Sequence, residues 1–307
     1  MPDSPLSASP YEVLGVAVSA TEDELRRAFR RMLRQTHPDT GGDHARFVAV
    51  QLAWEWIGSP EKRAAYDQSR DIPNEAHSWA AQAARPRTDT RPRARSYGHP
   101  GGWRRERYLA QLREWAGRGV TLDDPYDPAL VRSAPREIRH ILADALAEEA
   151  TARVLSALGI GFTVWHDVGT AQPGERLDHK IDHVVLGPTG LFAILSEDYG
   201  GAVRIRKGEL IGAAVAGERP MHAIAQRAKG LARSLRVRFT GLVIVLPDDA
   251  LDEPMIVLGS VRGAATVAVR HSQLPSLLRS GLAGSAAIGG NELFDVRTRL
   301  QDGIRFV

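Results

Sequence analysis

The chain has 307 residues, of which 43% are hydrophobic and 25% charged, as in a soluble globular protein long enough for two domains. The formal net charge of +3 is too small on its own to indicate a nucleic-acid-binding protein. The chain contains no cysteine, which excludes disulfides and thiolate metal or redox sites. It also lacks the run of about 18 apolar residues that a membrane helix needs, so we expect a cytoplasmic protein without membrane contact.

Residues 10–70 show the apolar periodicity of helices. Thr21 followed by Glu24 is the signature of a capping box, so a helix is predicted to begin there. One side of this helix is apolar. The other side is basic and carries Arg26, Arg27, Arg30, Arg31 and Arg34. An apolar second helix and a shorter third helix, which starts at Pro60, are predicted to follow.

A loop that contains His37, Pro38 and Asp39 joins the first two of these helices. The order of features resembles the J-domain of DnaJ-type co-chaperones. The matching residues are Tyr11, Leu14, Gly15, the basic helix, the His37-Pro38-Asp39 tripeptide, Phe47, Ala53 and Tyr66-Asp67. The resemblance implies a small all-α helical hairpin that binds a DnaK-type chaperone through the tripeptide and the five arginines, and stimulates its ATP hydrolysis. A solvated basic face and an ordinary turn are the alternative interpretation of the same residues.

Residues 71–105 lose the periodicity and are rich in Arg, Pro and Gly, which predicts a flexible linker. Eight arginines and only two acids lie between Arg85 and Arg107. This segment is a candidate for electrostatic binding of nucleic acid, with Tyr97 and Trp103 available to stack on bases. A solvated linker without such a partner is the simpler interpretation.

Residues 106–307 predict a domain that starts with a helical extension and continues with strands and helices. A long helix is expected after Ser133 as its cap, with Pro135 in the first turn. Strands are expected after Gly159, then a helix from Pro220, further strands, and at least one more helix. The order of elements predicts an α/β domain with a central mixed sheet. The whole chain is therefore expected to be an α+β two-domain protein, with domains at residues 1–70 and 106–307.

The phrase "IDHVVLGPTGLF", which starts at Ile181, is typical of a β-hairpin with a Gly-Pro-Thr-Gly turn. From about Glu148 to Val269 the sequence resembles the nuclease-related domain, a relative of the PD-(D/E)xK nucleases with their restriction-endonuclease-like fold. The resemblance implies that Asp182 is the metal-binding acid of the first hairpin strand. It also implies a leading-helix acid at Glu148 or Glu149, and Gln226 in a later helix.

The second strand of this hairpin departs from the family pattern, because Leu195 and Glu197 stand where an acid and a lysine are expected. Leucine cannot bind a metal, and glutamate has the opposite charge to lysine. Period-two alternation would place Leu195 and Glu197 on one face of the strand and Asp198 on the other. Lys180 and Lys207 are candidate substitutes for the missing lysine, although neither has the expected spacing.

These features predict a co-chaperone or adaptor, in which a J-domain activates a DnaK-type chaperone and a nuclease-like domain without activity provides targeting. For this co-chaperone or adaptor no cofactor is expected, and no residue is assigned a catalytic or metal-binding role. The alternative is a divergent Mg²⁺-dependent nuclease, or a nucleic-acid-binding protein, with an appended J-domain. If the nuclease site works, its residues are Asp182, Glu197, Glu148 and Gln226.

Overall fold

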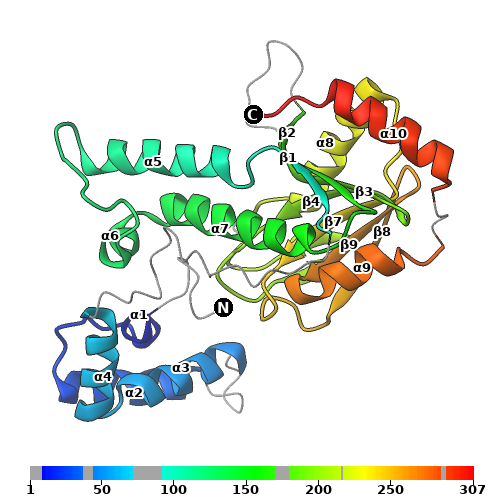
Figure 1. The fold of residues 1–307 in the computed structure, drawn as a ribbon. Coiled ribbons are helices and arrows are strands. Elements are labelled where there is room, and N and C mark those ends of the chain that lie inside the picture. Colours follow the sequence, from blue (N-terminus) through cyan, green and yellow to red (C-terminus); the bar gives the residue numbers. More distant parts are fainter. Residues whose placement is uncertain (1–8, 37–43, 72–91, 171–179, 216, 285–287) are drawn as a thin grey trace. The chain divides into compact units, whose positions relative to one another are not determined.

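The computed structural model describes residues 9–36, 44–71, 92–170, 180–215, 217–284 and 288–307. The chain divides into two compact units, one covering Ser7–Asp89 and the other containing Thr90–Val307 (Figure 1). Each unit is considered separately. None of the helices in the ranges just given is long and apolar enough to cross a membrane.

The N-terminal unit is helical, as predicted for a J-domain. Its helices are α1 (Pro10–Leu14), α2 (Glu22–Thr36), α3 (His44–Ile57) and α4 (Pro60–Asp71). The predicted capping box before α2 is confirmed, because Glu24 accepts from the Thr21 backbone N–H at 2.8 Å and donates its own N–H to the Thr21 hydroxyl at 3.4 Å. Buried Tyr11, Leu14, Leu25, Val50, Ala53 and Ile57 form most of its apolar core.

Aromatic and polar contacts tie the outer parts of this unit to its core. Phe29 of α2 and Trp54 of α3 stack with ring centroids 4.4 Å apart. The Tyr11 hydroxyl donates to Asp67 at 2.8 Å and accepts from Arg63 at 3.1 Å, which fastens α4 to α1. Trp54 therefore serves as an aromatic core anchor.

The C-terminal unit is built on a mixed seven-stranded sheet, which confirms the predicted central mixed sheet. The strand order is β1-β2-β3-β4-β7-β9-β8, with parallel pairs β1/β2, β4/β7 and β7/β9 and antiparallel pairs β2/β3, β3/β4 and β8/β9. The strands are β1 (Arg95–Tyr97), β2 (Thr163–Gly169), β3 (Lys180–Gly187), β4 (Gly190–Ser196), β7 (Gly241–Leu246), β8 (Met255–Val261) and β9 (Ala264–Arg270). The pairing of β8 with β9 is interrupted by a bulge between Val257 and Gly259.

Helices cover both faces of this sheet (Figure 1). The helices are α5 (Gly102–Ala116), α6 (Pro128–Ser133), α7 (Arg136–Ser156), α8 (Pro220–Leu235), α9 (Leu274–Ser280) and α10 (Gly290–Gly303). One apolar cluster packs α8 and α10 on the sheet and includes Ile181, Val184, Leu195, Ile224 and Leu300; we call it the α8-side cluster. A second, the α7-side cluster, packs α7 and α9 on the opposite face and includes Leu155, Val185, Ile194, Leu274 and Leu278.

Three details differ from the prediction. The expected linker does not extend to residue 105, because β1 pairs with β2 and α5 begins at Gly102. Ser133 ends α6 and its hydroxyl donates to the carbonyl of Leu130, so Pro135 rather than Ser133 is the N-cap of α7. Not all strands between Gly159 and Pro220 join the central sheet, because β5 (Arg204–Arg206) and β6 (Glu209–Ile211) form a separate hairpin.

The alternation of side chains breaks in the middle of β2 and β3. Trp165 and Val168, three residues apart, both belong to the α8-side cluster, and so do Ile181 and Val184. Strict alternation would put the two members of each pair on opposite faces. Asp167 has a left-handed backbone with φ 51°, which is uncommon outside glycine and rotates the strand at this point. Asp167 is thereby free to point away from the α8-side cluster.

Candidate functional site

Seven charged side chains gather where β2, β3 and β4 meet α7 and the first turn of α5. We call them the charge cluster: Arg104, Asp144, Glu148, Asp167, Lys180, Asp182 and Glu197. The five acids and Lys180 are buried, and the Arg104 side chain is 15% exposed. Buried charges are stable only when they are paired and hydrogen-bonded, so this arrangement depends on close contacts.

Lys180 lies at the centre of the cluster. Its Nζ donates to both oxygens of Glu148 at 2.7 and 2.6 Å and to Oδ1 of Asp167 at 2.6 Å. The same nitrogen is 3.0 Å from Oδ1 of Asp182, whose Oδ2 accepts from the backbone N–H of Ser196 at 2.8 Å. One ammonium group thus joins α7, β2 and β3.

Arg104 of α5 is the second cation of the cluster, and the sequence did not point to it. Its Nε and Nη1 donate to Glu148 Oε1 and Asp144 Oδ2, each at 2.5 Å, and Nη2 is 3.5 Å from Glu197 Oε1. Gly101, at the start of α5, fixes the position of α5 against α7. Its N–H donates to Glu148 Oε2 at 3.1 Å, and its φ is 73°. A Cβ at Gly101 would lie 2.9 Å from the carbonyl oxygen of Ala145, so glycine brings α5 close to α7.

Burial and charge together set the protonation of the acids. Burial, aided by the Asp182 carboxylate, raises the pKa of Glu148 to about 8. Burial also raises the pKa of Asp144 well above its usual value and that of Glu197 to about 7, although Arg104 opposes both shifts. Burial alone would raise the pKa of Asp182 as well, but Lys180 and Arg104 hold it below its ordinary value. Asp182 is therefore the one of these four acids whose pKa favours the ionised form.

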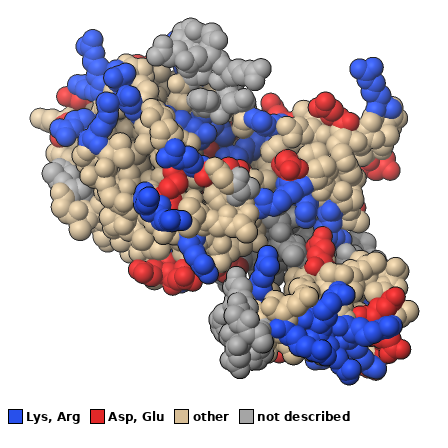
Figure 2. Space-filling model, turned by 180° about the vertical axis from the view of Figure 1, so that it is seen from behind, with Lys and Arg blue, Asp and Glu red and all other residues tan. Residues whose placement is uncertain are grey.

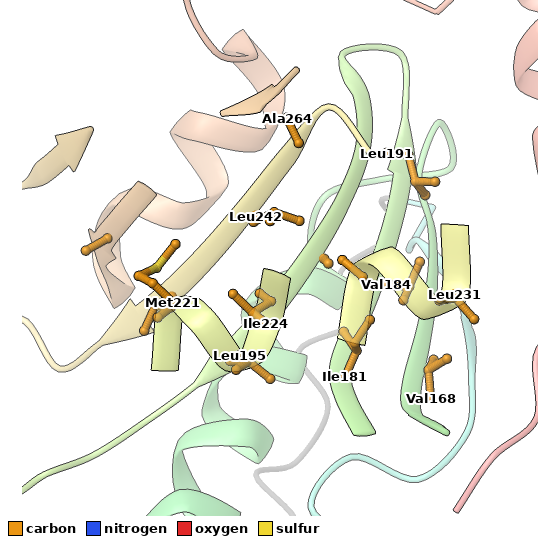
Figure 3. Packing of buried hydrophobic residues seen from close by; sticks show 14 of the residues in the cluster. Val168, Ile181, Val184, Leu191, Leu195, Met221, Ile224, Leu231, Leu242 and Ala264 are labelled. Carbon is orange, nitrogen blue, oxygen red and sulfur yellow. The ribbon is translucent and has the colours of Figure 1, made fainter. Parts of the chain in front are cut away.

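The second hairpin strand contributes no acid to this cluster. Leu195 is 1% exposed and packs in the α8-side cluster, near Ile224 and Met221 of α8 (Figure 3). Glu197 follows the end of β4 and reaches Arg104, on the side of α7. The expectation that Leu195 and Glu197 share a face is therefore wrong, because alternation applies only as far as the strand continues.

The residues present do not fit the Mg²⁺ site that a PD-(D/E)xK-like nuclease needs. Asp182 and Glu148 do come together, but the Lys180 ammonium lies between their carboxylates, and Leu195 offers no oxygen. Of the two candidates for the leading-helix acid, Glu148 joins the charge cluster, whereas Glu149 pairs with Arg105.

Other candidates from the sequence lie elsewhere. Lys180 is brought to Asp182, whereas Lys207 is exposed in the turn between β5 and β6. Gln226 is exposed on α8 and forms no hydrogen bond with the charge cluster among the described residues. The Asp198 carboxylate accepts from the Gly200 backbone N–H at 2.8 Å, so it closes the turn after β4.

A pair of buried histidines lies beside the cluster. The Nδ1 atoms of His166 and His183 are 2.7 Å apart, and the Ser96 hydroxyl is 2.7 Å from His166 Nε2. Burial, with Lys180 nearby, lowers the pKa of His166 to about 4, and burial lowers that of His183 as well. Both rings are therefore neutral at pH 7, and they link β1, β2 and β3.

The aromatic residues considered for base stacking are engaged within the C-terminal unit. The Tyr97 ring stacks on Trp165 with centroids 6.0 Å apart. The Trp103 ring has the Arg107 guanidinium 5.2 Å and the Lys180 ammonium 5.8 Å from its centroid. Both aromatic rings thus have partners of their own, and the sequence could not foresee either contact.

The candidate chaperone-binding surface lies on the N-terminal unit. The five arginines of α2 are all exposed, and Lys and Arg side chains gather on the face of this unit that Figure 2 shows. His37, Pro38 and Asp39 lie outside the described residues, in the segment between α2 and α3. The basic helix face is thus confirmed as exposed, whereas the geometry of the tripeptide stays a prediction.

Comparison with known proteins identifies both parts of the chain. The DnaJ domain family matches residues 9–67, and the nuclease-related domain family matches residues 143–246. The chain is 48% identical over 61 residues to the chaperone protein DnaJ of Dictyoglomus thermophilum, which covers 19% of this chain and 16% of that protein. It is 48% identical over 58 residues to the chaperone protein dnaJ A6 of Oryza sativa, which covers 19% of this chain and 14% of that protein.

These chaperone matches are confined to the N-terminal unit, so the chain spans at most about a sixth of the length of these two curated relatives. The two family matches do not overlap, and each falls within one of the two compact units. The chain therefore carries a DnaJ domain at residues 9–67 and a nuclease-related domain at residues 143–246.

Proposed function

We propose that this protein is a co-chaperone whose DnaJ domain binds a DnaK-type chaperone and stimulates its ATP hydrolysis. The observation that carries the proposal is the DnaJ family match at residues 9–67, which includes the His37-Pro38-Asp39 tripeptide. The tripeptide follows directly on α2, so the basic face and the tripeptide are neighbours along the chain. Asp39 offers a carboxylate that a partner arginine can bind with two hydrogen bonds.

The charge of α2 supports docking to an acidic surface of the partner. Arg26, Arg27, Arg30, Arg31 and Arg34 are exposed, while Leu25 and Ala28 on the other side of the helix are buried. Nη2 of Arg26 lies 3.3 Å from Oε2 of Glu22, and Nε of Arg27 donates to the carbonyl oxygen of Asp23. These two arginine side chains are therefore partly engaged within the helix. A basic face of this kind raises the association rate and makes binding dependent on salt.

The nuclease-related domain is proposed to select the target without cutting nucleic acid. In support, Leu195 replaces a metal-binding acid and points into the α8-side cluster. The Asp182 carboxylate already accepts from Ser196 and lies against Lys180. A phosphodiester and its metal ion would have to displace buried, short ion pairs, which is costly.

The ATPase of a DnaK-type chaperone under single-turnover conditions tests the co-chaperone proposal. The full chain is expected to stimulate hydrolysis at low salt, and His37→Gln is expected to abolish the stimulation. Arg30→Glu should weaken it, whereas Arg206→Glu, an equal charge change on exposed β5, should not. No stimulation by the unaltered chain, or equal losses in Arg30→Glu and Arg206→Glu, would contradict the proposal.

The alternative function is a divergent Mg²⁺-dependent nuclease, and one observation favours it. Glu148, Asp182 and Lys180 belong to one cluster, so two of the expected acids and one lysine are adjacent. Incubation of the full chain with DNA and Mg²⁺ tests this function directly. Cleavage that disappears in Asp182→Asn would establish it and would overturn the non-cleaving interpretation.

A further inference from the structure

Three side chains at the outer end of the charge cluster bring metal-ligand atoms together. His140 and Asp144 lie one turn apart on α7, and Glu197 follows the end of β4. Each offers a ligand atom, and these atoms lie within 4.8 Å of one another. An imidazole nitrogen with two carboxylates is a common ligand set for divalent transition metals.

Two buried polar atoms at the same place have no hydrogen-bond partner among the residues that the structure describes. They are the Tyr199 hydroxyl and Nε2 of His140. Tyr199 is only 2% exposed, and its ring centroid is 5.5 Å from that of His140. Its hydroxyl interacts electrostatically with the carboxylates of Glu197, Glu218 and Asp144. A buried hydroxyl without a partner is unfavourable, so this one calls for a ligand that the described residues do not supply.

The charge balance favours a cation at this place. The charge cluster has five buried carboxylates, and within the described residues Lys180 and Arg104 are the lysine and arginine that contact them. Glu218 adds a half-exposed carboxylate 3.7 Å from Nδ1 of His140. Arg136 also faces His140, but its guanidinium donates to the carbonyls of Tyr199 and Ala214. Arg104 and Arg136 repel an added cation, whereas the carboxylates of Asp144, Glu197 and Glu218 attract it.

We propose that His140, Asp144 and Glu197 bind one divalent transition-metal ion, such as Zn²⁺ or Mn²⁺, and that the Tyr199 hydroxyl donates to a water molecule on this ion. The site shares Glu197 with the residues considered for a Mg²⁺-dependent nuclease, but it uses neither Leu195 nor Asp182. Lys180 continues to neutralise Glu148 and Asp182. The ion would tie α7 to the chain that follows β4, which is a structural rather than a catalytic role.

Metal binding by the full chain tests this proposal without any activity assay. The protein is stripped of metal with a chelator and titrated with Mn²⁺, while the electron paramagnetic resonance signal reports the free ion. We expect one bound Mn²⁺ per chain, displaced by Zn²⁺. The echo-modulation spectrum of the bound Mn²⁺ should show coupling to one imidazole nitrogen. Saturable binding of neither ion, or bound Mn²⁺ without a coupled nitrogen, would overturn the proposal.

Matched variants place the ion. His140→Gln and Glu197→Gln are expected to weaken Mn²⁺ binding at least about tenfold. His222→Gln removes an exposed imidazole from α8, and His37→Gln removes a histidine of the DnaJ domain; both variants should bind Mn²⁺ as the unaltered chain does. Asp182→Asn should also keep the site. Binding lost in His222→Gln or His37→Gln, or lost in Asp182→Asn but kept in His140→Gln, would place the ion elsewhere and refute the proposal.

Because the readout on the unaltered chain needs no variant, a folding defect in one variant does not remove the test. Circular dichroism melting of each variant shows whether it is folded before its affinity is compared. The result is also independent of the co-chaperone proposal, which depends on ATP hydrolysis by a partner.

Discussion

Replacement of Lys180 by methionine tests whether its ammonium holds the charge cluster together. Methionine keeps the unbranched shape of the side chain and removes the charge. The Lys180 side chain is 3% exposed, and its Nζ lies within 3.0 Å of four carboxylate oxygens. Removing one member of a buried ion pair costs about 3–5 kcal/mol, because the remaining charge stays buried without a partner.

We expect a loss of about 4 kcal/mol in the opening free energy of β3 and β4, at the middle of that range. Three carboxylates lose their contact with Lys180, which increases the loss, although Arg104 still contacts Glu148. Proton uptake by Glu148, whose pKa is already raised to about 8, limits it. The loss should therefore be larger at pH 8 than at pH 6, since fewer of the acids are protonated at the higher pH.

Hydrogen–deuterium exchange with mass spectrometry measures this loss in peptides from β3 and β4, separately from the DnaJ domain. A loss of about 4 kcal/mol makes opening roughly a thousandfold more frequent. Lys207→Met removes an exposed lysine from the same unit and should change exchange little. Glu148→Gln added to Lys180→Met should restore part of the protection. A loss below about 1 kcal/mol for Lys180→Met, as for a surface ion pair, would refute the reasoning.

Three further predictions concern other parts of the chain. Leu195→Glu restores the acid of the nuclease pattern but should not produce Mg²⁺-dependent DNA cleavage. It should lower the melting temperature more than Leu195→Ala does, because the carboxylate enters the apolar α8-side cluster. Cleavage by Leu195→Glu would contradict the placement of this residue. Tyr11→Phe should cost about 1 kcal/mol of stability in the DnaJ domain through loss of its hydrogen bonds to Asp67 and Arg63, and an unchanged urea midpoint would argue against these bonds. The pKa of His166 is about 4 in the folded state and near 6.5 in the unfolded state. As the pH falls from about 6.5 to 4, the unfolded chain therefore takes up a proton at this histidine and the folded chain does not. Protonation of His166 should thus lower the free energy of unfolding by up to about 3 kcal/mol in that range. The difference in urea midpoints between the unaltered chain and His166→Gln across this range isolates the effect, and a difference independent of pH would exclude it.

The sequence predicted most of the architecture, because its signals are local. Apolar runs bounded by glycine marked β3, β4 and β7, and the Thr21–Glu24 pair marked the start of α2. The end of the linker was misjudged for a physical reason. β1 is only three residues long and all three are exposed, so its segment has the composition of a solvated chain although its backbone pairs with β2.

The candidate site was predicted only in part, because its geometry depends on contacts between distant segments. Asp182 and Glu148 were expected to meet, and they do so through Lys180. Arg104 could not be distinguished from its arginine neighbours, since only the packing of α5 on α7 brings it to Glu148. The left-handed backbone of Asp167 has no signal in the sequence, and it interrupts the side-chain alternation of β2.

The two outermost strands of the sheet bear on the tendency of the protein to associate with other chains. A strand at the margin of a sheet exposes unpaired backbone groups, to which a strand of another molecule can add. β1 offers only three residues for such pairing. β8 is longer, and its Val257 is 61% exposed, but the bulge between Val257 and Gly259 interrupts the regular ladder there. A short strand at one margin and an irregular one at the other make this sheet a poor template for aggregation, although its central strands are strongly apolar.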